Sequence, residues 1–488
     1  MMYKNKFAII LLVLLALLFS IQTASAAPIV KSEEEPVYTP QIDLADCIVI
    51  ALAKNYSILQ SKEELIKAEV EYYNLINEKL LLKLGGTTSV VSTSTDSTTH
   101  DFDATGSLTY KAPSGDSMKV ELGNHQNFMY PFLGRSASAE FRHPLAKGQG
   151  NIVAWHDIRD AKRNWTLEEV NYFTSKQTLA ARVIELYFRL ILNEQLIGVN
   201  KASVQSSKEN LEITQKKFNE GLIPKLDLTR IEGMVLSSEL ALLTAKKNWK
   251  DTKDELMTIL GLDPRIEIEP VSEIPSSILS FEEDICIETA LRDRKELLTE
   301  EINIEKIKDA LVIAKNNKKP QIDFVARWDS SKIGSDSKDY QKSYTTWTAM
   351  LEYSMDINRK RLDTDIRQAE REGILSLEKL EDRKRIIIRE IRMCLRDLDI
   401  AQSEIINQEA NLEAEKERLK LATRSWEEGI LENREMVDTQ MAIVSRQSAC
   451  VHAKISKILA EYELKRAMGE DLAELVLRLK NQKTSDDE

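Results

Sequence analysis

The feature that most limits the fold of this 488-residue chain is an internal duplication. The stretches KKFNEGLIPKLD at 216–227 and RSWEEGILENRE at 424–435 share a basic residue, an aromatic residue, a glutamate, a glycine and an aliphatic pair. At the same spacing, without a gap, further positions match: Ile158 and Ile366, Leu190 and Leu398, Gly261 and Gly469. Because the chain has only 16 Gly and 6% aromatic residues, such matches indicate two structural repeats.

The front segments of the two repeats correspond at a slightly different spacing. DCIVIALAKNYSIL at 46–59 resembles DICIETALRDRKELL at 284–298, with Cys47 opposite Cys286. The change in spacing means that the region after this front segment is about 31 residues longer in the first repeat than in the second. The first repeat therefore carries an insertion.

The amino terminus has the pattern of a secretory signal. Lys4 and Lys6 precede an apolar run from Phe7 to Phe19, and ASAA follows at 24–27. The run of about 13 residues is shorter than the about 20 that a spanning helix needs, so we expect cleavage after Ala26 rather than a short membrane anchor. The expected segments are the signal peptide at 1–26, an extended linker at 27–42, the first repeat at 43–262, a second linker at 263–282, the second repeat at 283–470 and a polar tail at 471–488.

One region of each repeat alternates apolar and polar residues. Strict alternation indicates strands with one apolar and one polar face. In the second repeat these strands fall within 320–355, at QIDFVARWDS and TTWTAMLEYSM. In the first repeat they fall within 85–143: the segments are SASAEFRH at 136–143, a hairpin around the Pro-Ser-Gly-Asp turn of 106–123 and, more weakly, Gly85 to Ser97.

The rest of each repeat is glycine-poor and charged, which predicts long helices. A helix from about Asn151 to Lys217 would be about 100 Å long, and a counterpart precedes Trp426. The thin leucine stripe between Ser237 and Gly261 is typical of antiparallel coiled-coil packing. We therefore expect a mostly α-helical chain in which each repeat has the order helix, strands, long helix, break and helix.

About four strands per chain cannot close a barrel alone, because small barrels need about eight. Open sheet edges are not tolerated in lipid, so several copies would have to pool their strands. Three copies with four strands each would close a twelve-stranded barrel, and their long helices would form a tube that continues from it. No later segment is apolar for the length of a membrane-spanning helix.

The sequence resembles the TolC-type outer-membrane efflux proteins. The duplicated plan, HPLAKGQG at 143–150 and the paired FNEGL and WEEGI motifs carry the resemblance, which covers about 43–470. It implies a homotrimeric twelve-stranded outer-membrane barrel continued by an α-helical periplasmic barrel. It also implies the exit duct of a tripartite efflux pump or type I secretion system, with outer-membrane lipid, a periplasmic adaptor and an inner-membrane pump as partners.

The resemblance assigns roles to residues at the two glycine motifs. Leu431 stands where some members of the family have an arginine that ties the gate shut, so the same salt-bridge network is not implied. Without the resemblance, the acids near the motifs are ordinary solvated charges; with it, threefold symmetry would make them a ring that attracts cations. The expected adaptor-docking residues are Phe218, Gly221, Leu222, Trp426, Gly429 and Ile430, and the expected aperture residues are Asp227, Glu435 and Asp438.

Other classes of function find little support in the sequence. A net charge of −12 argues against nucleic acid as a partner, and there is no HExxH, P-loop or GxSxG motif. We therefore expect no enzyme activity, no catalytic residues, no metal site and no cofactor. The remaining alternative is an exported structural coiled coil or an adaptor-like periplasmic protein without a channel. Such a protein would not need strands of alternating polarity at matching places in two repeats.

Overall fold

The computed structural model describes residues 41–92, 98–127, 132–263, 265, 269–271, 281–335, 341–357, 359–428 and 430–486. The expected signal peptide and its cleavage after Ala26 lie outside these residues. The chain divides into a small unit, which includes β1 (Gln41–Ile42), and a large unit that holds 43–266 and 270–488. β1 pairs with β6 (Glu269–Pro270) in a two-stranded sheet.

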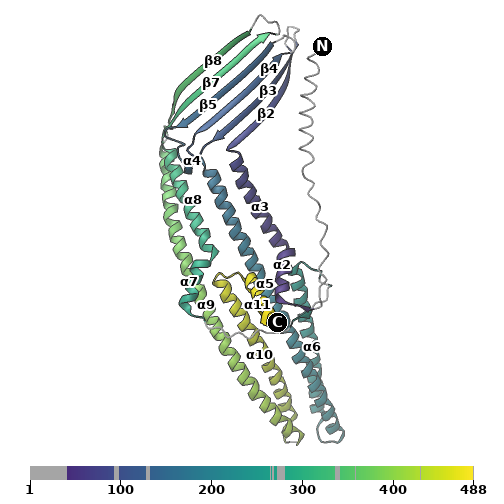
Figure 1. Cartoon of the computed structure of the whole chain (residues 1–488). Helices are drawn as coiled ribbons and strands as arrows, with labels where there is room; N and C mark the ends of the chain where they lie inside the picture. Colours follow the sequence, from purple (N-terminus) through teal and green to yellow (C-terminus); the bar gives the residue numbers. More distant parts are fainter. Residues whose placement is uncertain are drawn as a thin grey trace. The chain divides into compact units, whose positions relative to one another are not determined.

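The large unit contains two repeats of the same order, which confirms the duplicated plan expected from the sequence (Figure 1). The first repeat consists of α2 (Leu44–Lys54), α3 (Tyr56–Asn77), β2 (Leu80–Ser92), β3 (Thr98–Lys111), β4 (Ser117–Asn127), β5 (Phe132–Pro144), α4 (Asn151–Ala154), α5 (His156–Asn219) and α6 (Lys225–Leu260). The second consists of α7 (Glu283–Asp293), α8 (Lys295–Asn317), β7 (Gln321–Ser335), β8 (Gln341–Ser354), α9 (Arg359–Glu427) and α10 (Asn433–Ala467).

The strands of both repeats join in one antiparallel sheet with the order β2-β3-β4-β5-β7-β8. The first repeat contributes β2 to β5, and the second contributes β7 and β8. The sheet has six strands where the sequence predicted about four, so the expected number must be corrected: three copies carry eighteen strands rather than twelve. The additional pair is the hairpin of β2 and β3, which overlaps the weaker candidate Gly85 to Ser97 and the first arm of the hairpin expected at 106–123.

Four helices lie side by side at each level of the helical part. Near the sheet the neighbours are α3, α5, α8 and α9; farther from the sheet, α6 and α10 take the places of α3 and α8 beside the long helices α5 and α9 (Figure 1). The 64 residues of α5 and 69 of α9 correspond to about 100 Å each. The expected long helix from Asn151 is interrupted at Trp155, where α4 ends and α5 begins.

Gly261 and Gly469, which occupy matching positions in the two repeats, have the same structural role at the ends of helices. Gly261 ends α6 with φ +68°, and Gly469 follows α10 with φ +87°. A Cβ atom at Gly261 would lie 2.9 Å from the carbonyl oxygen of Lys54, at the end of α2. At Gly469 it would lie 3.1 Å from the carbonyl carbon of Asp293, at the end of α7. Each repeat thus packs its last helix against its first through a glycine in the left-handed conformation.

A buried ion-pair cluster joins the two repeats between α5 and α8. Asp309 accepts hydrogen bonds from Arg159, at 2.8 Å, and from Arg163. Arg163 and Asp309 are both 7% exposed. Burial alone would raise the pKa of Asp309, but the two arginine hydrogen bonds outweigh it and lower that pKa below its usual value. The carboxylate is therefore held in its charged form.

The end of the chain differs from the expected polar tail. Residues Leu472–Asp486 form helix α11, and Leu472, Ala473 and Val476 on it are buried. All four cysteines are buried and free. Among the described residues, no helix combines the length and the apolar character that crossing a membrane requires.

Candidate functional site

The first glycine motif closes the turn between α5 and α6. Gly221 has φ +73°, and its N–H donates to the carbonyl of Phe218 at 2.9 Å. The N–H of Leu222 donates to the carbonyl of Lys217, also at 2.9 Å. This pair of bonds is the Schellman arrangement, which satisfies the last carbonyls of a helix and needs a left-handed residue after it. The motif therefore reverses the chain rather than bending one helix.

The second glycine motif lies between the end of α9 at Glu427 and the start of α10 at Asn433. Gly429 itself lies outside the described residues. The N–H of Ile430 donates to the carbonyl of Ser425 at 2.8 Å, the counterpart of the bond from Leu222 to Lys217. The two repeats therefore end their long helices in matching turns.

The structure brings the two turns together through Lys217 and Trp426. The Lys217 ammonium donates to the carbonyl of Trp426 at 2.8 Å and lies 4.2 Å from the centre of the indole ring. Trp426 is only 2% exposed, so its ring is part of the packing between the hairpins and not of the outer surface. Phe218 is half-buried, whereas Leu222 and Ile430 are 68% and 75% exposed. The exposed aliphatic pair forms the apolar surface of the turns.

The three acids of the expected aperture occupy two places. Asp227 lies in the first turn of α6 and forms an ion pair with Arg230 at 3.3 Å. Glu435 and Asp438 are exposed and three residues apart on α10, so they share one side of that helix. Met436 and Val437 between them are buried, which places the two acids on the side away from this chain's own packing.

One face of the sheet carries continuous rows of apolar side chains. Leu82 at one edge is 67% exposed and Trp347 at the other edge is 80% exposed, although both are large and apolar. One row across the six strands is Leu82, Leu108, Val120, Ala139, Trp328 and Trp347; the next is Leu80, Tyr110, Met118, Phe141, Ala326 and Ala349. An apolar band of this extent on a sheet face marks a surface made to be covered.

The opposite face of the same strands is polar. Arg142 on β5 donates to Asp323 on β7 at 3.0 Å and to Glu352 on β8 at 2.6 Å. Lys119 and Glu121 on β4 form an ion pair at 2.7 Å. A full row on this face is Lys83, Ser107, Glu121, Ser138, Asp329 and Thr346. The sheet thus separates an apolar side from a charged, hydrated side.

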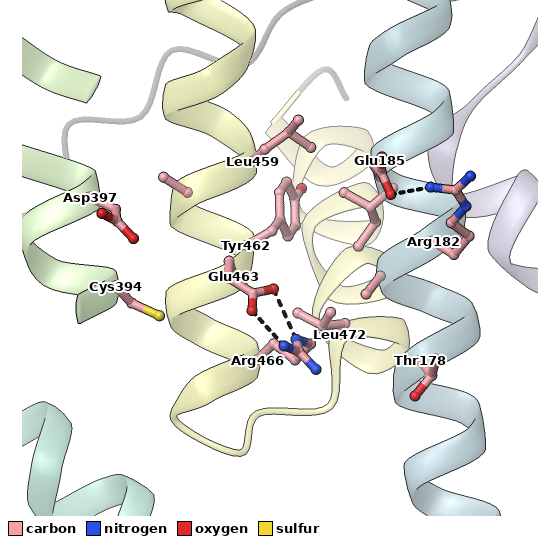
Figure 2. Close-up of a pocket in the computed structure, with 13 residues that line it drawn as sticks. Thr178, Arg182, Glu185, Cys394, Asp397, Leu459, Tyr462, Glu463, Arg466 and Leu472 are labelled. Atoms are coloured by element: carbon pink, nitrogen blue, oxygen red, sulfur yellow. Dashed lines mark hydrogen bonds and ion pairs between the residues drawn. The ribbon is translucent and has the colours of Figure 1, made fainter. Parts of the chain in front are cut away.

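A cavity of about 550 Å³ lies among α5, α9, α10 and α11 (Figure 2). Its charged groups are largely paired with one another: Arg466 donates to Glu463 at 2.9 Å, and Arg182 donates to Glu185 at 2.5 Å. Burial raises the pKa of the Cys394 thiol on its wall to about 11, so this cysteine stays protonated and is a poor nucleophile. In the part of the chain that the structure describes, no group of three or more His, Cys, Asp or Glu side chains could hold a metal ion.

Sequence reasoning missed two groups that matter to this arrangement. Lys217 lies next to the first motif, but its bond to Trp426 depends on how α5 meets α9, which no local pattern reveals. Arg142 was visible as a polar residue in an alternating strand, but its partners on β7 and β8 follow only from the strand register. In both cases the missing information was a contact between the two repeats.

Replacing Gly221 by alanine should destabilise the first turn. A Cβ atom there meets nothing within 4 Å, so the cost arises only from the left-handed backbone and is about 1–2 kcal/mol. Gly198 inside α5 is the matched control, because a Cβ atom there also meets nothing and alanine favours a helix by about 0.5–1 kcal/mol. Thermal unfolding followed by circular dichroism should give shifts of opposite sign. A stabilising Gly221→Ala would contradict the turn geometry.

The comparisons with known proteins agree with this geometry. The family model "Outer membrane efflux protein" matches residues 151–262 and 286–470. The chain is 21% identical over 329 residues to the pyoverdine export outer membrane protein OpmQ of Pseudomonas putida, which covers 65% of this chain and 68% of OpmQ.

Solved structures show the same fold. The fold matches that of CusC with a TM-score of 0.66 at 14% identity, over 87% of this chain and 92% of CusC. It matches that of the outer membrane protein VceC from Vibrio cholerae with a TM-score of 0.64 at 15% identity, over 87% of this chain and 96% of VceC. With the family model matched over more than half of its length, the chain belongs to the outer membrane efflux protein family.

Proposed function

We propose that this protein is the outer-membrane exit duct of a tripartite export system. Three copies pool their sheets into a closed barrel in the outer membrane and their helices into a tube that crosses the periplasm. The duct conducts substrates passively from an inner-membrane pump and its adaptor, and it needs no cofactor. The likeness to OpmQ, whose name describes pyoverdine export, favours small-molecule efflux over type I protein secretion.

The observation that carries this proposal is the two-faced sheet. Its apolar rows end in side chains as exposed as Trp347, at 80%, which water would not tolerate over such a band but lipid would. The charged face with Arg142 and its acidic partners would line an aqueous passage. An exported coiled coil or an adaptor-like protein without a channel has no use for this arrangement.

The turns at the far ends of the helical hairpins are the proposed docking and gating end. Exposed Leu222 and Ile430 offer apolar contacts to the adaptor, and Phe218 and Gly221 shape the first turn. Trp426 supports this surface from inside through Lys217. Glu435 and Asp438 face away from the packing of their own chain, so a threefold axis can gather three copies of each around an aperture.

Cell fractionation tests the proposal as a whole. The protein should remain with the outer membrane until detergent is added, and unheated samples should migrate on gels as β-containing trimers that dissociate on boiling. Crosslinkers placed beside Leu222 or Ile430 should capture an adaptor. Recovery as a soluble periplasmic protein would exclude the duct and leave the coiled-coil alternative.

Neutralising the proposed aperture should change its ion selectivity. The double variant Glu435→Gln and Asp438→Asn removes six carboxylates from a three-copy ring, so the preference for cations over anions should fall several-fold. Reversal potentials in planar bilayers under a salt gradient measure this preference. The control is Glu413→Gln, an exposed acid on α9 that already pairs with Lys416 at 3.3 Å. Equal ion selectivity in all three proteins would show that Glu435 and Asp438 do not line the aperture.

A further inference from the structure

We infer that the hairpin of β2 and β3 is an additional part of the barrel wall, and that β8 of one copy pairs with β2 of the next. Three copies then close an eighteen-stranded barrel instead of a twelve-stranded one. The inference rests on the proposed trimeric duct and assigns its inter-copy seam. The partner at the seam is a second copy of this chain.

The hairpin is an insertion at the start of the sheet. Its strands run from Leu80 to Lys111, which matches the about 31 residues by which the first repeat exceeds the second. The Lys111 N–H donates to the carbonyl of Lys79 at 2.8 Å, so the chain leaves and re-enters the structure at nearly the same point. Without the hairpin, α3 would lead directly into the turn before β4.

The hairpin continues both faces of the sheet in register. β3 pairs with β4 from Asp101 opposite Asn127 to Lys111 opposite Ser117, along the whole of β4. Leu80, Leu82 and Leu84 on β2 extend the apolar rows and are 61%, 67% and 83% exposed. Lys83, between Leu82 and Leu84, extends the polar row of Ser107 and Glu121. A hairpin folded into the passage would have no reason to repeat this pattern.

The two edges of the sheet suit each other. Within the residues that the structure describes, β2 pairs only with β3 and β8 only with β7, and they lie at opposite edges (Figure 1). β2 has 13 residues and β8 has 14, both enough to cross a membrane as tilted strands. Because the six strands alternate in direction, β8 runs antiparallel to β2 of the next copy, so the ladder can close without an unpaired edge in lipid.

The width of the sheet supports the same conclusion. Six strands at a spacing of about 4.8 Å and a tilt of about 40° occupy about 38 Å of a barrel's circumference, whereas four occupy about 25 Å. Four helices packed about 8–10 Å apart occupy about 32–40 Å. The six-stranded sheet therefore covers the arc of the four helices that it joins, and no step in diameter separates barrel and tube. An eighteen-stranded barrel is about 36 Å across, and a twelve-stranded one about 24 Å.

Disulfide crosslinking between copies tests which strands meet at the seam. Neighbouring strands hold Cβ atoms about 4.5–5.5 Å apart, within reach of a disulfide, and all four native cysteines are buried. Lys83→Cys on β2 is combined in turn with Thr346→Cys, Thr348→Cys and Met350→Cys on β8, and one combination should give covalent dimers and trimers. Lys119→Cys on β4 is the matched control and should not crosslink to β8. Crosslinks from Lys119→Cys, or none from Lys83→Cys, would overturn the inference.

A second variant measures the width of the passage. Deleting 80–110 joins Lys79 to Lys111, whose N–H already donates to the carbonyl of Lys79, so the remaining four strands should still assemble as a trimer. The largest polymer that enters the outer end in bilayer recordings should then fall in diameter by about a third. If the largest polymer that enters were unchanged, the eighteen-stranded barrel would be overturned but the duct function would not. A complex with the mass of two copies would overturn both the eighteen-stranded barrel and the trimer. Loss of membrane association in the unmodified protein would instead contradict the proposed duct function.

Discussion

Replacing Ala139 by arginine should abolish assembly of the barrel. Ala139 lies in the apolar row between Val120 on β4 and Trp328 on β7, with the apolar row of Met118, Phe141 and Ala326 beside it. A lipid-facing arginine near the middle of the membrane costs about 2–4 kcal/mol per chain, or about 6–12 kcal/mol for three chains. Folded trimer on unheated gels of outer-membrane fractions should therefore fall below detection.

The neighbouring Ser138 provides the matched control. It lies on the same strand but on the polar face, opposite Glu121 on β4 and Asp329 on β7. An arginine at this position points into water and gains acidic neighbours, so Ser138→Arg should assemble like the unmodified protein. Equal assembly of Ala139→Arg and Ser138→Arg would mean that the apolar rows do not face lipid.

Replacing Asp309 by alanine should weaken the joint between the two repeats. Arg163 would remain buried without its main acceptor, a change that costs about 3–5 kcal/mol. Asp160, 3.0 Å from Arg163, remains and favours the lower end of this range. The measurement is the denaturant concentration at which the helical signal is lost in detergent.

Two controls separate the lost charge from a general loss of packing. Asp251→Ala breaks the exposed ion pair with Lys247 and should leave the midpoint nearly unchanged. Combining Arg163→Met with Asp309→Leu removes both buried charges and should recover most of the loss. If the double variant were as unstable as Asp309→Ala, the cluster would stabilise the joint by packing rather than by charge.

The same cluster predicts a pH dependence. Because the folded pKa of Asp309 is lowered, its contribution is present above the unfolded value of about 4 and is lost as the pH falls through the folded value. Stability of the unmodified protein should therefore decline below about pH 4, and the Arg163→Met and Asp309→Leu variant should decline less. Parallel acid titrations of the two proteins measure the difference.

The sequence predicted the duplicated fold because glycines and aromatic residues mark it at a constant spacing. It underestimated the sheet because LLLKLGG at the start of β2 does not alternate strictly, and only pairing with β3 separates Leu80, Leu82 and Leu84 from the residues between them. The insertion of about 31 residues was the available signal. Helix α11 was missed because the polar residues at the chain end outweighed the apolar positions Leu472, Ala473 and Val476.

For the candidate site, the sequence located the turns but not their internal contacts. Gly221 and its Schellman bonds follow from a local motif, so they were predictable. The burial of Trp426 was not, because it depends on Lys217 from the other repeat. The roles of Glu435 and Asp438 stay a proposal, since a single chain fixes which side of α10 they occupy but not what gathers there.

The hydrogen bond between Lys111 and Lys79 closes the base of the hairpin, so the inner diameter of the proposed barrel changes only in whole steps. A hairpin whose two ends meet can be gained or lost without breaking the path of the chain from α3 to β4. Gaining or losing the hairpin changes the barrel of three copies by six strands at once, so barrels of intermediate diameter do not form. One chain, with and without this hairpin, would supply two protein nanopores of different inner diameter.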